Sequence, residues 1–171
     1  MPINIANFQN ESNNNYTRMK SIATLFICLF SIGIFAQTSE EDAVKNTIDT
    51  FFEAFHKQDT VALKSMVTKE VILQSIGKGR EGDVRLNTSE FHQFITSIAS
   101  IPKDKGFKEK LLGYEIKIDG DMANAWTPYE FWFDGNFSHC GVNSFQLIKL
   151  NGDWKIFYLV DTRRREGCQT N

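Results

Sequence analysis

The spacing of apolar residues divides the chain into a helical first part and a β-rich second part. Apolar side chains recur every three or four positions near the start of the domain, which predicts an amphipathic helix over residues 40–57. The same spacing predicts shorter helices over 61–67 and 89–99, with a strand over 70–76 and a polar loop over 77–88 between them. In the second part the period shortens. Four strands are predicted there, over residues 111–118, 122–133, 137–150 and 154–163.

The predicted strands are separated by dipeptides that are typical of tight hairpin turns. These are Asp119-Gly120, Asp134-Gly135 and Asn151-Gly152, and both residues of such pairs tolerate the positive φ angles that two-residue turns require. Consecutive strands should therefore pair antiparallel. Three helices followed by a run of long strands predict an α+β domain, with the helices gathered on one face of a bent sheet.

The turns also predict which side chains share a face of the sheet, because the register fixes the facing. A two-residue turn at Asn151-Gly152 would place Phe145 opposite Tyr158, and a turn at Gly135-Asn136 would place Trp132 opposite His139. One face is then predicted to carry Trp126, Glu130, Trp132, His139, Asn143, Phe145 and Tyr158. The other face is also largely apolar, and since the helices can cover one face only, we expect the outer face to pair with a second copy as a homodimer.

The first 36 residues are predicted to be a targeting segment. Residues 22–35 form a nearly unbroken apolar run that follows Arg18 and Lys20 and ends before Ala36. Such a run is typical of a secretory signal and is short for a membrane span, although an uncleaved anchor is the alternative. We expect cleavage after Ala36, and a secreted or periplasmic product with no membrane attachment. The predicted organisation is a mis-called extension over residues 1–18, a signal peptide over 19–36 and one domain over 37–171.

Composition limits the function. The chain has 171 residues and a net charge of −2, which argues against a nucleic-acid binder, since such proteins usually carry a basic excess. Fifteen phenylalanines must line a core or an apolar cavity.

Two of the three cysteines, Cys140 and Cys168, lie in the predicted domain, and an exported protein can oxidise such a pair. Whether the bend at Glu166-Gly167 brings them within bridging distance is left open by the spacing.

Two stretches resemble the nuclear transport factor 2-like superfamily, which includes SnoaL-like polyketide cyclases, ketosteroid isomerases and scytalone dehydratase. The first is the run from Ile48 to Asp59, continuing to Ala62-Leu63, and the second is Phe145 to Ile156, which ends in Gly152-Asp153-Trp154-Lys155-Ile156. The resemblance covers the whole predicted domain. It implies a cone-shaped, strongly bent antiparallel sheet wrapped around three N-terminal helices, with a deep apolar pocket. The family hosts enzymes and non-enzymes, so the resemblance implies no single reaction.

The functional residues of the ketosteroid isomerases are not retained at the matching positions. By this resemblance they fall at Phe51, at about Gln74 and at Asn143. Isomerisation through a dienol needs a carboxylate base and proton-sharing donors, which Phe51 and Gln74 cannot supply, so isomerase activity is not expected. The resemblance nevertheless implies that the face of Asn143 is the pocket face. The predicted ligand-binding residues are Phe51, Gln74, Trp126, Trp132, Asn143 and Phe145.

His139 is the strongest candidate for chemistry on that face. A histidine and a carboxylate in an apolar cavity can act as general base and acid, so His139 is the candidate base and Glu130 or Tyr158 the candidate acid or orienting group. The alternative is a histidine at the rim, with Glu130 paired to an arginine of residues 163–165. The segment 161–165 itself is interpreted as a solvated basic strand end. No histidines have metal-ligand spacing, so no metal or cofactor is expected.

Three functions therefore stay open. The first is an exported protein that binds a small apolar or amphipathic ligand without an assigned reaction. The second is a lyase, dehydratase or cyclase that uses His139 as its base. The third is a dimeric interaction module whose cone is filled by its own aromatic side chains, and the volume of the cavity separates this possibility from the other two.

Overall fold

The computed structural model of the protein describes residues 40–168. The predicted extension and signal peptide, and the cleavage position after Ala36, lie outside this range. The described chain begins in a helix over residues 40–57. The elements that follow are α2 (Thr60–Ser65), β1 (Val67–Lys78), β2 (Val84–Ser89), α3 (Phe91–Ser100), β3 (Phe107–Leu111), β4 (Glu115–Asp119), β5 (Met122–Phe133), β6 (Asn136–Leu150) and β7 (Asp153–Thr162).

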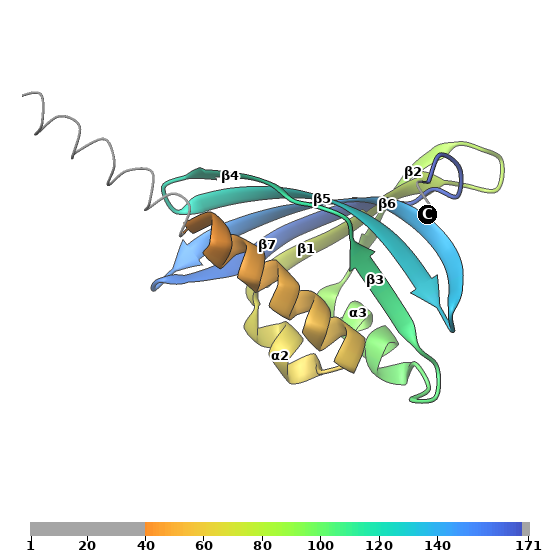
Figure 1. Ribbon diagram of the computed structural model, residues 1–171, viewed down its shortest axis with the longest axis horizontal. Helices are drawn as coiled ribbons and strands as arrows, with labels where there is room; N and C mark the ends of the chain where they lie inside the picture. The colour runs from red at the N-terminus through yellow and green to blue at the C-terminus, as the bar shows by residue number, and fades with distance from the viewer. Residues whose placement is uncertain (1–39, 169–171) are drawn as a thin grey trace, which may run out of the picture. The chain divides into compact units, whose positions relative to one another are not determined.

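The strands form one curled sheet with the order β2-β1-β7-β6-β5-β3, and β4 pairs with the other part of β5. All neighbours are antiparallel except β1 and β7, which are parallel. The helices lie on one side of the sheet, where it is concave (Figure 1). The α+β fold class with helices on one face of a bent sheet is therefore confirmed. No helix within residues 40–168 is long and apolar enough to cross a bilayer.

The core lies between the first helix and the concave face of the sheet. The helix places Phe51, Phe52 and Phe55 on one side, and all three are buried. Phe145 of β6 meets Phe51 and Phe52 edge to face, with ring centroids 6.4 Å and 6.0 Å apart. Full burial of a phenylalanine side chain contributes about 1.5–3 kcal/mol, so this row of rings holds the helix against the sheet.

The end of the first helix is fixed by two polar side chains. Gln58 adopts a positive φ of 55°, and its amide donates hydrogen bonds to the carbonyls of Ile98 and Ile101 at 3.0 Å and 2.8 Å. Asp59 then caps α2 by accepting hydrogen bonds from the backbone at Val61 and Ala62. These contacts set the position of α3, which forms one wall of the site.

The hairpin at Asn151-Gly152 begins with the predicted register and then departs from it. Leu147 lies opposite Ile156 as expected, but a bulge at the next position places Gln146 opposite Tyr158 and Phe145 opposite Leu159. The extra residue reverses the facing of the rest of β7. Leu159 and the residues at alternate positions beyond it face the helices, and Tyr158 does not.

The hairpin before it also differs from the prediction. The two-residue turn is Asp134-Gly135, and Phe133 lies opposite Asn136. With the bulge that follows, Phe131 lies opposite His139 and Trp126 lies opposite Ser144. The predicted pairing of Trp132 with His139 is wrong, because the bulge shifts the register by one residue and so brings the alternate side chains of β5, including Phe131, onto the face of His139.

Two strand boundaries were also predicted incorrectly. The polar segment expected to be a loop contains strand β2, which pairs with the end of β1. The strand expected over residues 111–118 is two strands, β3 and β4, which pair with opposite ends of β5. Because the chain breaks between β3 and β4, β3 forms one edge of the sheet. This strand carries Glu109.

Candidate functional site

A cavity of about 450 Å³ lies between the helices and the concave face of the sheet. This volume is within the usual range for small-molecule sites. Its walls come from the first helix, α3 and strands β1, β3, β5, β6 and β7. Ser89, Gln93 and Ser97 also line it, and all three are exposed, so the cavity opens to solvent beside the N-terminal half of α3.

One half of the cavity is apolar. Phe51 and Phe55 of the first helix stack on Phe94 of α3, with ring centroids 6.5 Å and 5.9 Å apart. Leu73 and Leu159 complete this part of the wall from the sheet. These side chains have no hydrogen-bonding groups, so this half can contact only apolar surface.

The other half is polar, and Glu109 of β3 is its principal acidic group. The side-chain amide of Asn143 donates a hydrogen bond to Glu109 Oε1 at 2.7 Å. Burial raises the pKa of the Glu109 carboxyl from 4.5 to about 7, against the opposing effect of the Asn143 hydrogen bond. Asp161 raises it further and Arg163 lowers it. Close to neutral pH this carboxyl can therefore both accept and release a proton.

The backbone of Glu109 is fixed by the first helix. Its N–H donates a hydrogen bond to His56 Nε2 at 2.9 Å. Burial, followed by the charge of Lys108, lowers the pKa of the His56 imidazole, which favours the neutral ring that can accept this bond. His56 thus joins the end of the first helix to β3.

A second polar group faces the cavity from β5 and β7. Tyr129 Oη donates to Asp161 Oδ2 at 3.1 Å and to the Thr162 carbonyl at 3.0 Å. Arg163 Nε donates to the same Asp161 oxygen at 2.7 Å. Burial, with Asp161 next, raises the pKa of the Tyr129 hydroxyl far above neutral pH, so Tyr129 stays protonated and acts as a donor.

No protein-family model matches the sequence, and no curated protein matches it. Solved structures do match the described fold. An NTF2-like protein with a cystatin-like fold from Novosphingobium aromaticivorans superposes with a TM-score of 0.60 at 12% identity, over 79% of this chain and 88% of that one. The chain has the nuclear transport factor 2-like fold.

Two further structures with the nuclear transport factor 2-like fold carry provisional activity names. A candidate scytalone dehydratase from Novosphingobium aromaticivorans matches with a TM-score of 0.59 at 10% identity, over 75% of this chain and 86% of that one. A candidate ketosteroid isomerase from Shewanella frigidimarina matches with a TM-score of 0.52 at 17% identity, over 70% of this chain and 94% of that one. At such sequence identities the structural likeness establishes the fold and does not assign an activity.

Several of the predicted site residues do line the cavity of this nuclear transport factor 2-like domain. Phe51, Asn143 and His139 are part of its wall. Gln74 also borders it, although its side chain bonds to Tyr158 and Thr88 at 2.6 Å and 3.0 Å. Phe145 is fully buried and packs behind the rings of the first helix, so it supports the wall.

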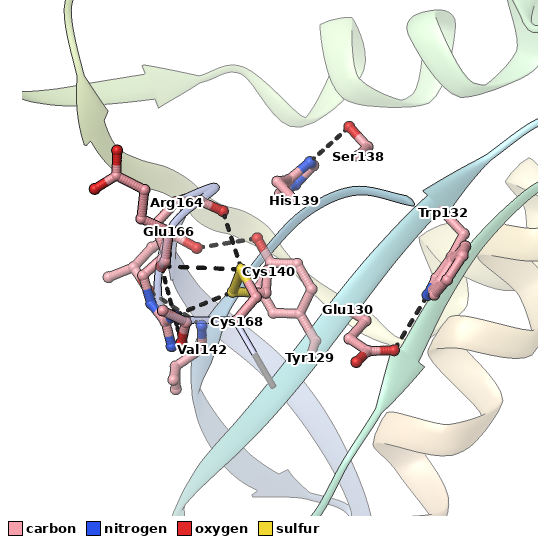
Figure 2. The surroundings of a disulfide bond; sticks show 12 residues. Tyr129, Glu130, Trp132, Ser138, His139, Cys140, Val142, Arg164, Glu166 and Cys168 are labelled. Atoms are coloured by element: carbon pink, nitrogen blue, oxygen red, sulfur yellow. Dashed lines mark hydrogen bonds between the residues drawn. A yellow bond between two sulfur atoms is a disulfide. The ribbon is translucent and has the colours of Figure 1, made fainter. Parts of the chain in front are cut away.

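His139 sits on the wall with its ring stacked on Phe131, at 5.0 Å between centroids. Its Nδ1 is 3.0 Å from the hydroxyl of Ser138 (Figure 2). Burial, and then the charges of Arg163 and Arg165, lower the pKa of the imidazole against the effect of Asp161. The ring is therefore neutral at pH 7, and it can accept a proton but holds it weakly.

Four of the predicted residues lie on the opposite face of the sheet. Trp126 and Trp132 are absent from the cavity wall, and Trp126 is 45% exposed. Glu130 is buried on that face, where it accepts a hydrogen bond from Trp132 Nε1 at 3.2 Å (Figure 2) and pairs with Lys110 at 3.7 Å. Tyr158 is turned outward by the bulge in β7. The predicted shared face for these residues with His139 is wrong, because both hairpin registers were misplaced by one residue.

The prediction missed the acidic and basic groups that line the cavity. Glu109 was overlooked because the strand was predicted to begin at residue 111, whereas β3 begins at Phe107, so no facing could be predicted for Glu109. Asp161 and Arg163 were expected at a solvated strand end. The expectation is wrong for Asp161, whose side chain is 12% exposed and lines the cavity, whereas Arg163 borders the cavity with 59% of its side chain exposed. Their alternation along β7 was visible in the sequence, but the bulge at Phe157 decides which face they take.

Cys140 and Cys168 are joined in a disulfide, with Cα atoms 5.8 Å apart (Figure 2). The chain beyond β7 bends back, because Gly167 has a φ of 64° and Arg164 pairs with Cys140 through two backbone hydrogen bonds of 3.0 Å and 2.9 Å. The question that the sequence left open is thus answered. The bridge holds the segment that directly follows Asp161 and Arg163.

The described residues contain no group of three His, Cys, Asp or Glu side chains arranged to hold a metal ion. The acidic groups of the cavity instead have partners within the protein. Asp161 accepts from Tyr129 and Arg163, and Glu109 accepts from Asn143.

Proposed function

We propose that this protein is exported and binds a small amphipathic molecule in the cavity. The observation that carries the proposal is the division of one 450 Å³ space into an apolar half and a hydrogen-bonding half. The apolar half, made by Phe51, Phe55 and Phe94, would take the hydrophobic body of the ligand. Glu109, Asn143 and Arg163 would bind its polar end, since both donors and acceptors are present there.

The cavity also bears on the two alternatives. A cone filled by its own aromatic side chains would leave no such space, so a purely structural interaction module is not favoured. An enzyme remains a second candidate, and the observation that favours it is a titratable carboxyl on the cavity wall.

The disulfide supports export. Disulfides form and persist in secreted and periplasmic proteins and are rare in reducing compartments. The bridge between Cys140 and Cys168 therefore agrees with a secretory signal over residues 19–36. The sequence of the mature N-terminus, read by Edman degradation or mass spectrometry after expression in the source cells, tests the cleavage after Ala36.

We also infer that the outer face of the sheet pairs with a second copy. It carries Ile72 and Trp126, which are 47% and 45% exposed, and an outer groove is lined by Ile148, Phe157 and Tyr158. Contiguous exposed apolar surface of this kind marks interaction sites. Sedimentation equilibrium should show a dimer that Ile72→Lys converts to a monomer, whereas a monomeric wild type would contradict the inference.

The binding proposal can be tested with anilinonaphthalene sulfonate, a fluorescent probe with an apolar body and one anionic group. Ser97 lines the mouth of the cavity on α3, whereas Ala99, which is also exposed on the same helix, does not. Ser97→Trp should obstruct the cavity and weaken probe binding at least about tenfold, which is about 1.4 kcal/mol. Ala99→Trp is the matched control and should bind like the wild type.

Two results would contradict the binding proposal. One is a wild-type protein that does not bind the probe saturably. The other is equal binding by the wild type and both tryptophan variants, because the probe would then occupy a different surface. Circular dichroism of both variants establishes that the fold is retained.

A further inference from the structure

We propose that Glu109 is a general base that removes a proton from the molecule held in the cavity. This inference rests on the proposed function, because the carboxyl can act only on a molecule that the cavity binds. It names a different base from His139 and a residue that no sequence motif marked.

The geometry of Glu109 leaves one carboxyl oxygen available. Oε1 accepts the hydrogen bond of Asn143 at 2.7 Å, whereas no described residue donates a hydrogen bond to Oε2. The residue lines the cavity and its backbone is held by His56 at 2.9 Å. The backbone of Glu109 and one oxygen of its carboxyl are thus held in place while the other oxygen is free, which is the arrangement that a general base needs.

The surroundings tune this carboxyl for proton transfer near neutral pH. Burial raises its pKa to about 7, and general bases work best when the pKa lies near the operating pH. The charged and titratable groups that act on the carboxyl or border the same polar half are Asp161 of β7, Arg163 directly after β7, Tyr129 of β5, His139 of β6 and His56 of the first helix.

The other acidic groups are poorer candidates. Asp161 Oδ2 is occupied by hydrogen bonds from Tyr129 and Arg163. Glu130 lies on the outer face with Trp132 and Lys110. His139 does line the cavity, but the lowered pKa of its imidazole makes it a weaker proton acceptor than Glu109. The test must therefore separate Glu109 from His139.

Arg163 can complement the base. Its Nε is bound to Asp161 at 2.7 Å, while no described residue accepts from its two terminal nitrogens. A guanidinium at the polar end of the cavity can stabilise the negative charge that develops on a substrate oxygen as the proton leaves. The substrate class is therefore a small, largely apolar molecule with an acidic C–H bond whose electrons move to an oxygen atom.

Nitrobenzisoxazole is a probe of this class. A base takes the proton from its ring carbon, the C–H electron pair forms the nitrile, and the N–O bond breaks to leave a coloured phenolate. No oxidant, reductant or metal is needed. The molecule is flat and aromatic, so the phenylalanine half of the cavity can hold its ring. Displacement of anilinonaphthalene sulfonate reports its binding independently of any reaction.

The expected result is saturable turnover by the wild type, after subtraction of the buffer reaction, with kcat/KM rising through an apparent pKa near 7. Glu109→Gln should lower kcat/KM at least about 100-fold, the usual contribution of a general base, while still displacing the fluorescent probe. Glu115→Gln removes an exposed carboxylate of β4 outside the cavity and should leave the rate unchanged.

The outcomes separate this inference from the proposed function. If the wild type does not bind anilinonaphthalene sulfonate, the proposed binding fails and the inference fails with it. If the probe binds but nitrobenzisoxazole neither displaces it nor is turned over, binding stands and the inference is overturned. If it displaces the probe but Glu109→Gln turns over like the wild type, binding stands and the inference is overturned. Loss of turnover in His139→Gln, with Glu109→Gln unaffected, would also overturn it by assigning the base to His139. Should Glu109→Gln fold poorly, His139→Gln decides between the two bases, because turnover retained in that variant supports Glu109 and turnover lost in it overturns the inference.

Discussion

The amide of Asn143 on β6 donates a hydrogen bond to Glu109 on β3 across the intervening strand β5, at 2.7 Å. The two residues are 34 positions apart in the chain. This bond joins the edge strand to the centre of the sheet at the polar end of the cavity. It also favours the charged form of Glu109, and burial opposes that effect.

Replacing Asn143 by leucine should make Glu109 harder to ionise. Leucine has a similar size but no donor, so the pKa of the Glu109 carboxyl should rise above about 7. The pH profile of nitrobenzisoxazole turnover should then move to higher pH. An unchanged profile with a lower rate at every pH would mean that Asn143 supports the fold alone and does not position the base.

The stability of the protein should depend on Glu109 between about pH 4.5 and pH 7. Its carboxyl has a raised pKa in the folded state, so the folded state holds the proton over a range in which the unfolded state has released it. Stability therefore falls as the pH rises through this window, by up to about 3 kcal/mol. Relative to the wild type, Glu109→Gln should gain that amount between about pH 4.5 and about pH 8.

Urea denaturation of both proteins across this range measures the effect. Glu115→Gln, which removes an exposed carboxylate of β4, is the control and should follow the wild type. A Glu109→Gln variant whose stability relative to the wild type is the same at both ends of the range would show that the carboxyl titrates at its ordinary pKa.

Loss of the disulfide should destabilise the domain without opening the cavity. The bridge closes a loop between positions that are 28 residues apart, and the chain-entropy model assigns such a loop about 3–4 kcal/mol. Cys168→Ser should lower the urea midpoint accordingly. Intact mass with and without reductant, together with thiol alkylation, checks the bridge itself. Two thiols that alkylate without reductant would contradict it.

Gly141 should tolerate no side chain. A Cβ at this position would overlap the carbonyl oxygen of Thr162, and it would also approach the Tyr129 ring at 2.9 Å. The backbone of β7 cannot yield easily because Arg164 is bonded to Cys140 beside it. Gly141→Ala should therefore cost at least about 1–3 kcal/mol, as overpacked sites do.

The matched control is Gly113→Ala, since a Cβ at Gly113 would meet no atom within 4 Å. Thermal melts of both variants compare the two sites. Equal melting temperatures would show that β6 has room for a Cβ beside the Thr162 carbonyl of β7, which would contradict the prediction.

The fold could be predicted from the sequence because helix spacing and turn residues are local features of the chain. The three-and-four spacing of Val44, Ile48, Phe51 and Phe55 is sufficient to define a helix face, and all four residues are buried. The hairpin at Asn151-Gly152 was likewise correct at Leu147 and Ile156, next to the turn. Strong turn residues fix pairing at close range.

The site was less accessible because it depends on two bulges. The extra residue at Phe157 turned Asp161 and Arg163 into the cavity and Tyr158 out of it. No residue type predicts such a bulge, which accompanies the curvature of the sheet around the helices. Glu109 could not be predicted either, because nothing in the composition of its strand distinguishes a partly buried glutamate from a solvated one.

NMR titration of the Glu109 side-chain carboxyl carbon tests most directly whether a proton-accepting carboxyl lies on the wall of a ligand cavity. Comparison with Glu109→Gln assigns the resonance. We expect a midpoint of about 7 that shifts when anilinonaphthalene sulfonate fills the cavity. A midpoint near the ordinary value of 4.5, insensitive to the probe, would contradict it.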